Sequence, residues 1–161
     1  MKYVVDTGAL LSLSCSIYFK LLLQEYTFSI TPEVQFELEQ FSQYDDFLGQ
    51  KAQEIIKLKL EKITPVTVLS LPLEKAECEV FFVAKEKRSI AITDDVHAAR
   101  VLFEKTKIKA KPSFYLLLLL YQKKKISKEN LIIDIKSVLN YRNWLGGTLE
   151  EYASRLIEGL E

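Results

Sequence analysis

Residues 2–10 read Lys-Tyr-Val-Val-Asp-Thr-Gly-Ala-Leu, and this stretch is the strongest indication of the fold. The apolar positions of Lys2–Asp6 do not alternate with polar ones, which is typical of a short strand buried on both faces. Helical sequence at Gly8–Leu13 follows without a linker. A doubly buried strand that leads directly into a helix predicts the first unit of an α/β fold.

The same alternation continues along the chain. We predict further strands at Thr27–Thr31, Val66–Leu69 and Ile90–Thr93, with a candidate fifth at Ile108–Ala110. The predicted helices are Ile17–Gln24, Glu33–Ser42, Tyr44–Lys62, Leu73–Lys87, Val96–Lys105 and one that starts at Ser113. Short connections between alternating strands and helices favour a mostly parallel central sheet.

The last part of the chain, from about residue 126 to 161, is predicted to be helical. Ser127 is a candidate helix cap, and Thr148–Glu151 matches a capping box that starts the final helix. That helix carries an apolar stripe of Leu149, Tyr152, Leu156, Ile157 and Leu160. The stripe either packs on its own domain, which the preceding Gly146-Gly147 turn favours, or lies at an interface with a second copy. Without a linker or repeat, residues 1–161 are predicted to form one domain.

Composition excludes several classes of protein. The 22 Lys and Arg balance the 22 Asp and Glu, so no global field attracts nucleic acid or membrane. Cys15, Cys78 and the single His97 are too few for a disulfide framework or a His/Cys metal site. The longest apolar run, Phe114–Tyr121, is far shorter than the ~20 residues that a membrane helix needs. We expect no membrane span and a cytoplasmic location.

Acidic residues follow two predicted strands directly. Asp6 ends the first strand, and Asp94 and Asp95 follow Ile90–Thr93. Ligands of parallel α/β sheets bind at the carboxyl ends of strands, so these acids are candidate site residues. Capping of the helices that follow is an equally good explanation at this point.

Two glutamates lie on predicted apolar helix faces. Glu37 shares a face with Val34 and Leu38, whereas Glu39 lies among polar neighbours. Glu77 shares a face with Val80, Phe81 and Ala84. A buried carboxylate must be protonated, paired or metal-bound, and a shared Mg²⁺ or Mn²⁺ would satisfy several at once. The alternative is that each glutamate reaches water at a helix end.

Four motifs, in order, resemble those of PIN-domain nucleases. They are Val4–Leu10 with Asp6, Thr31–Leu38 with Glu37, Ala76–Ala84 with Glu77, and Ile90–Arg100 with Asp94 and Asp95. Lys111–Lys125 and the tail with Trp144-Leu145 also resemble one prokaryotic PIN subgroup. The resemblance therefore covers nearly the whole chain.

The resemblance implies a three-layer α/β/α, RNase H-like fold whose acidic pocket binds Mg²⁺ or Mn²⁺. It assigns catalysis and metal binding to Asp6, Glu37, Glu77 and Asp94, with Asp95 replacing or assisting Asp94. The implied activity is a metal-dependent endoribonuclease that hydrolyses phosphodiester bonds in single-stranded RNA. Many relatives are toxins held by a small antitoxin protein and relatives commonly dimerise, so an antitoxin is a candidate partner and a homodimer the expected assembly.

Three further residues are candidate supporting groups. Thr7 and Thr93 are placed to hydrogen-bond the carboxylates or a metal-bound water, although strand-end and capping roles explain them as well. Arg100 is a candidate partner for an acid of the site or for a phosphate. His97 is expected to be incidental. Alternating lysines at 105–111 are candidates for an RNA backbone contact, but protection of an edge strand is the favoured explanation.

Two other functions compete with the nuclease. One is a catalytically inactive PIN-like module that binds RNA or protein. The other, less favoured, is a phosphoacceptor receiver domain, which requires an aspartate after the third strand; the predicted strand Val66–Leu69 is followed by none.

Overall fold

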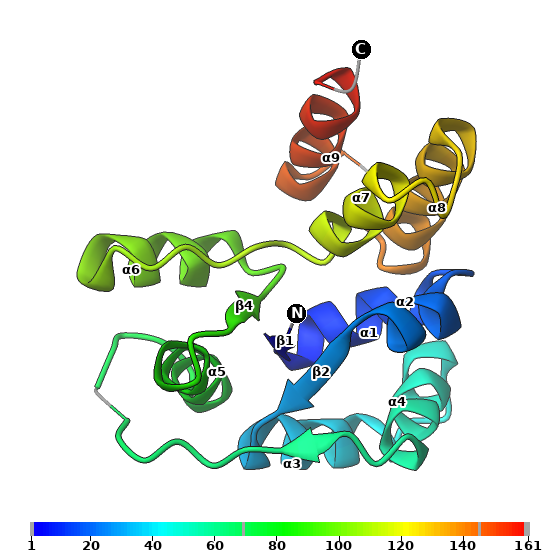
Figure 1. The fold of residues 1–161 in the computed structure, drawn as a ribbon. Coiled ribbons are helices and arrows are strands. Elements are labelled where there is room, and N and C mark those ends of the chain that lie inside the picture. The colour runs from blue at the N-terminus through cyan, green and yellow to red at the C-terminus, as the bar shows by residue number, and fades with distance from the viewer. Residues whose placement is uncertain (1, 69, 145, 160–161) are drawn as a thin grey trace.

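The sheet at the centre of the molecule is parallel throughout. The computed structural model describes residues 2–68, 70–144 and 146–159, and Figure 1 shows its four strands, β1 (Lys2–Val5), β2 (Thr27–Ile30), β3 (Glu61–Lys62) and β4 (Ile90–Ile92). Their order across the sheet is β3-β2-β1-β4. Tyr3 pairs with Phe28 on one side and with Ile90 on the other. The predicted α/β class with a parallel sheet is confirmed.

Helices connect and flank these strands. In the described part of the chain they are α1 (Thr7–Cys15), α2 (Phe19–Glu25), α3 (Pro32–Phe41), α4 (Phe47–Lys57), α5 (Lys75–Glu86), α6 (Val96–Thr106), α7 (Phe114–Gln122), α8 (Lys128–Tyr141) and α9 (Thr148–Glu158). α5 packs against β1 and β4, and α2 packs against β2. α1 contacts α3, α4 and α8, and α2 contacts α7, so the C-terminal helices join the domain through α1 and α2 (Figure 1).

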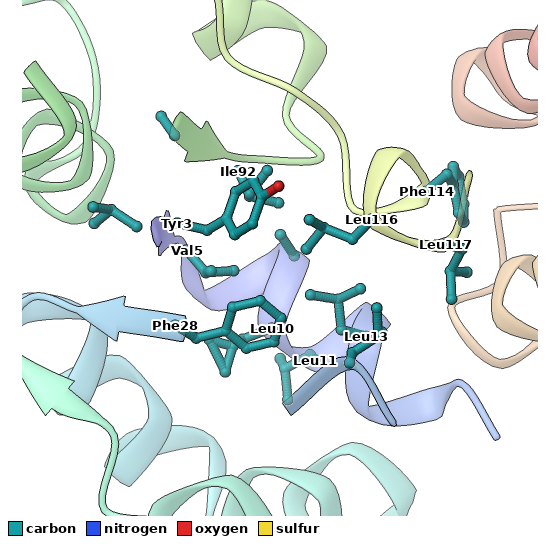
Figure 2. Packing of buried hydrophobic residues seen from close by; sticks show 14 of the residues in the cluster. Tyr3, Val5, Leu10, Leu11, Leu13, Phe28, Ile92, Phe114, Leu116 and Leu117 are labelled. Carbon is teal, nitrogen blue, oxygen red and sulfur yellow. The ribbon is translucent and has the colours of Figure 1, made fainter. Parts of the chain in front are cut away.

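The core surrounds β1 and α1. Tyr3, Val4 and Val5 are at most 1% exposed, which explains why this strand shows no alternation of apolar and polar residues. Every residue of α1 except Gly8 is buried. Figure 2 shows leucines of α1 packing beside Phe28 of β2, Ile92 of β4 and residues of α7. The first strand–helix unit is therefore the part on which the other elements assemble.

The prediction of the third strand is wrong. The strand is the two-residue β3 at Glu61–Lys62, whereas the predicted helix Tyr44–Lys62 is replaced by α4, which ends at Lys57. Val66 is 90% exposed, and its amide donates to the Glu86 carboxylate instead of to a strand. Leu69, the end of the predicted strand, lies outside the described residues. An apolar run identifies a strand only when it is buried, and this one is not.

The candidate fifth strand at Ile108–Ala110 is also wrong. The structure has a single parallel bridge between Ile92 and Lys111. The Thr93 amide donates to the Lys111 carbonyl at 2.9 Å, and the Lys111 amide donates to the Ala91 carbonyl at 2.9 Å. This short contact nevertheless brings the start of α7 to the end of β4.

The C-terminal helices confirm one predicted cap and correct another. The Ser127 hydroxyl accepts from the Asn130 amide and caps α8. The predicted capping box at Thr148–Glu151 is wrong, because Gly147 is the cap and Thr148 is already helical. The Glu150 carboxylate accepts from the Gly146 amide and so satisfies a donor before the helix.

The apolar stripe of α9 packs partly within its own chain. Leu149 and Ala153 are buried, and Leu156 and Ile157 pack against the core. Tyr152 stays 39% exposed, and Leu160 lies outside the described residues. The expected homodimer stays a prediction.

No single helix among the described residues is both long and apolar enough to cross a membrane. α1 and α2 together would qualify by length and composition, but their axes are bent by 118° at the break between them.

Candidate functional site

The two strand-end aspartates lie where the direction of chain connection reverses. From β1 the chain continues to β2 on one side, while β4 lies on the other side of β1. Ligands of parallel sheets bind at such a switch point, outside the carboxyl ends of the strands. Asp6 follows β1 and Asp94 follows shortly after β4, and the Asp6 amide donates to the Ile92 carbonyl at 3.0 Å. The fold thus brings both acids to one edge.

The three aspartates that follow the strands differ in whether they cap a helix. Asp6 caps α1, with Oδ1 accepting from the Ala9 amide at 2.7 Å. Asp95 caps α6 by accepting from the Ala98 amide at 2.8 Å, and it is exposed. Asp94 does not cap α6, the helix that follows it: its Oδ1 accepts at 2.7 Å from the amide of Ser113, the residue just before α7. The capping explanation therefore accounts fully for Asp95, partly for Asp6 and not for Asp94.

Asp6 and Asp94 are both nearly inaccessible to solvent. They are 7% and 8% exposed. Burial raises the pKa of Asp6 to about 7, with smaller contributions from the charges of Asp94 and Glu77; the Thr93 hydroxyl and the Ala9 amide oppose the shift. Burial also raises the pKa of Asp94, and the Ser113 amide opposes that shift most strongly. Two buried carboxylates side by side thus favour uptake of a proton or a cation.

The two glutamates are half-buried and engaged locally. Glu37 on α3 accepts a short hydrogen bond from the Thr7 hydroxyl. Glu77 on α5 accepts from the Glu74 amide at 3.2 Å, within a capping box at the start of its own helix. Burial raises the pKa of both carboxyls; at Glu77 the charges of Asp95, Glu74 and Glu37 add to the shift. Glu77 therefore lies at a helix end, as in the alternative explanation, but it is half-buried there rather than open to water.

One cavity of about 780 Å³ collects the predicted acids. Asp6, Glu37, Glu77, Asp94, Asp95 and Thr7 all line it. Thr93 is buried; its hydroxyl accepts from the Asp95 amide and lowers the pKa of Asp6. Arg100 is not brought to the cavity: it is exposed on α6 and forms no ion pair with any described residue. His97 lies outside the cavity as well.

The donor set suits a hard divalent cation. Carboxylate oxygens are the preferred protein ligands of Mg²⁺ and Mn²⁺. Asp94 Oδ2 is buried without a hydrogen-bond partner, so one oxygen remains available for an ion. In the part of the chain that the structure describes, however, no three His, Cys, Asp or Glu side chains are close enough to hold an ion as they stand. For three of these carboxylates to share one cation, at least one of them must therefore leave its present hydrogen-bond partner and move.

Two lining residues were not among the predicted site residues. Arg142 ends α8, and Trp144 follows two residues later; both line the cavity. Trp144 is the only tryptophan of the chain, which is the signal that could have marked this turn. Glu79 was not selected either: it is buried, but it lies outside the cavity and accepts from the Glu33 amide at the start of α3.

Comparison with known proteins identifies the family. Residues 2–151 match the model of the family DUF3368, described as a PIN domain. No curated protein matches the chain. Among solved structures, a PilT N-terminus domain protein, SSO1118, from the archaeon Sulfolobus solfataricus P2 is 18% identical, with a TM-score of 0.43 over 73% of this chain and 92% of that one. Because the family model covers nearly the whole chain, this protein belongs to the PIN-domain family.

Proposed function

We propose that this chain is a metal-dependent endoribonuclease that hydrolyses phosphodiester bonds in single-stranded RNA. One observation carries the proposal: a single cavity is lined by Asp6 and Asp94, which follow two strands, and by Glu37 and Glu77, which lie on two helices. Membership of the PIN-domain family, whose members are typically metal-dependent nucleases, supports it. The raised pKa of Asp6 and Asp94 adds support, because a bound cation would offset the cost of keeping these buried carboxylates charged.

The residues present fit Mg²⁺ or Mn²⁺, held by Asp6 and Asp94 together with Glu37, Glu77 or Asp95. When bound, the ion neutralises charge on the phosphate and lowers the pKa of a coordinated water. Ser113 holds Asp94 by Oδ1 and leaves Oδ2 free. The Thr93 hydroxyl favours the charged form of Asp6, since it lowers the pKa of that carboxyl.

The remaining lining groups narrow the chemistry. Among the described residues, no histidine, cysteine or lysine lines this cavity; His97 lines an adjoining pocket that shares Glu77 and Asp95 with it. A cavity lined by carboxylates repels phosphate unless cations are present. The receiver-like alternative gains no support, because β3 is followed by Ile63 and Thr64 rather than by an aspartate.

Two glutamates on one helix provide the test. Glu37 lines the cavity, whereas Glu39 is exposed and bonds only to polar neighbours of α3, Gln35 at 2.7 Å among them. With 5′-labelled single-stranded RNA and millimolar Mg²⁺ or Mn²⁺, Glu37→Gln should lower cleavage at least about 10-fold, and Glu39→Gln should leave it unchanged. EDTA should abolish cleavage in all variants.

Cleavage that survives EDTA, or an equal loss in both variants, would contradict the proposal. RNA binding without cleavage under every metal condition would favour the inactive binding module. An antitoxin partner and a homodimer remain proposals as well, and light scattering of the purified chain tests the second. A monomeric mass at high concentration would remove the homodimer.

A further inference from the structure

The charged residues of the cavity wall are almost all acidic. Seven acidic residues line it: Asp6, Glu37, Asp46, Glu74, Glu77, Asp94 and Asp95. Arg142 is the one Lys, Arg or His among the described lining residues. Carboxylates and bound cations can process a phosphate, but they do not supply the hydrogen-bond donors that hold a polyanion in register. A lone arginine in such a wall is therefore the natural donor for a phosphate oxygen.

Local geometry fixes the position of Arg142. Asn143 follows it with a positive φ of 55°, a conformation that asparagine tolerates. The Trp144 amide donates to the Leu139 carbonyl at 2.9 Å, and the Asn143 amide donates to the Asn140 carbonyl at 3.0 Å. These two bonds form the Schellman pattern that ends a helix and sets the direction of the chain beyond it. The turn thus places Arg142 and Trp144 on the cavity side.

Arg142 is held by stacking rather than by an ion pair. Its guanidinium carbon lies 4.5 Å from the centroid of the Trp144 ring. No carboxylate of a described residue lies within 4.0 Å of it, and its Nε is buried without a hydrogen-bond partner. Burial lowers the pKa of Arg142, while the charges of Asp94 and Asp6 raise it. The side chain stays cationic, with donors left for a ligand.

Further aromatic rings line the same cavity. Trp144 lines the cavity together with Phe41 and Tyr44, which come from the end of α3 and the loop after it. Phe41 is 37% exposed and Tyr44 is 63% exposed. Partly exposed rings beside a cationic group are the usual platform for the bases of single-stranded nucleic acid, because every base has a face that can stack.

A buried contact holds this wall against the acidic site. Asp134 on α8 is 1% exposed and accepts from the Ser16 hydroxyl and from the Ile17 amide. Ser16 directly follows α1, the helix that Asp6 caps. Arg142 at the end of α8 is therefore held at a fixed position relative to Asp6.

We infer that Arg142 and Trp144 form the nucleotide-binding wall of the cavity, in which a base of single-stranded RNA stacks on Trp144 and the neighbouring phosphate accepts from Arg142. The inference rests on the proposed ribonuclease function and adds to it the part of the substrate that this turn recognises. It makes Arg142 a substrate-binding residue and not a counter-ion of the two aspartates.

Because Trp144 is the only tryptophan, its fluorescence reports the wall directly. We would titrate the Asp94→Asn protein, in Mg²⁺, with a single-stranded RNA octamer of mixed sequence. Stacking should quench the fluorescence, and double-stranded RNA of the same sequence should quench it much less, since its bases are already stacked. Equal quenching by both would overturn the stacking role. Since no cleavage is needed, this test fails or succeeds independently of the proposed function.

Variants of Arg142 test the phosphate contact by anisotropy of the labelled octamer. Arg142→Gln should raise Kd about 10-fold or more, and Arg142→Lys should recover part of the loss. The slope of log Kd against log salt concentration should fall by about 0.7 in the Gln variant, as expected when one contact to a single strand is lost. The control Arg155→Gln, at an exposed position of α9 outside the cavity, should change neither quantity.

A structural role would give a different result. If Arg142 only offset the charge of Asp6 and Asp94, Arg142→Gln would change Mg²⁺ affinity and leave the RNA Kd and its salt slope unchanged. That outcome would overturn the inference. Circular dichroism melts of each variant verify folding, and Trp144→Leu, expected to raise Kd about 5-fold or more, provides a second test should Arg142→Gln fail to fold.

Discussion

The aspartates and the glutamates of the cavity are held in different ways. Asp6 and Asp94 follow neighbouring parallel strands, are less than 10% exposed and are each fixed by a backbone amide at 2.7 Å. Glu37 and Glu77 extend from helices, are half-buried and bond to partners beside them. The sheet edge therefore holds the two aspartates, the preorganised half of the site, in place, although their burial removes them from water. The two glutamates on the helices form the movable half, which must rearrange to share a cation with them.

The first prediction concerns the preorganised half and has the largest expected effect. Asp94→Asn keeps the shape and the Ser113 contact but removes the charge of the oxygen that has no partner. RNA cleavage should fall about 1,000-fold, a greater loss than that of Glu37→Gln, because a fixed charged group contributes more than a movable one. Rates with labelled RNA at saturating Mg²⁺ test this order. A smaller loss at Asp94 than at Glu37 would contradict the comparison.

The second prediction concerns stability without metal. The pKa of Asp6 is about 7 in the folded protein, whereas an ordinary aspartate, as in the unfolded chain, has a pKa of 3.8. The folded protein therefore binds the proton more tightly than the unfolded chain does. This contribution to stability is complete below about pH 4 and is lost as the pH rises through about 7. The loss is at most about 4 kcal/mol at ~1.4 kcal/mol per pKa unit, and Asp94 acts in the same direction.

Chemical denaturation in EDTA at several pH values between 4 and 8 measures this effect. The free energy of unfolding should decline across the range, and Asp6→Asn should flatten the decline while keeping the cap of α1, since asparagine also caps helices well. Millimolar Mg²⁺ should restore stability at pH 8 by binding the folded state. A wild-type protein whose stability rises steadily across this range would show that folding does not raise the pKa of these aspartates.

The third prediction tests how the movable half is guided. Thr7 donates to Glu37, so Thr7→Val removes the bond that orients this carboxylate at the cavity. Cleavage should fall about 10-fold, the scale seen when an oriented ligand loses its hydrogen-bond partner. Thr7→Ser should recover most of the rate because the hydroxyl is kept. No recovery in the serine variant would assign the loss to packing of the Thr7 methyl group.

The same contrast explains what the sequence could predict. The unalternating strand before Asp6 and the short strand before Asp94 predicted the sheet edge, because burial on both faces leaves a local pattern. The apolar helix faces placed Glu37 and Glu77 near this edge. The hydrogen-bond partners of the glutamates followed from neither pattern, since Thr7 and Glu37 are 30 residues apart.

The remaining misses have a common physical origin. β3 has two residues, and its pairing depends on where β2 lies rather than on its own composition. The wall of Arg142 and Trp144 depends on a turn whose direction is set by Asn143 and on the contact of α8 with the end of α1. Contacts between distant segments leave no periodicity in either segment, so a single sequence does not reveal them.

The last prediction has the smallest expected effect and asks whether Glu77 keeps its capping bond or moves to the metal. In the structure its carboxylate accepts from the Glu74 amide, a bond that glutamine can also make. In EDTA, Glu77→Gln should therefore be at least as stable as the wild type, because it keeps this bond and removes a charge that the neighbouring acids repel. Glu77→Ala should be less stable than Glu77→Gln by roughly 0.5–1 kcal/mol, measured by urea denaturation. If Glu77 moves to the metal, saturating Mg²⁺ should increase hydrogen exchange at the Glu74 amide of the wild type but not of Glu77→Gln. Exchange that is unaffected by Mg²⁺ in both proteins would show that Glu77 keeps its capping role and that the cation is held without it.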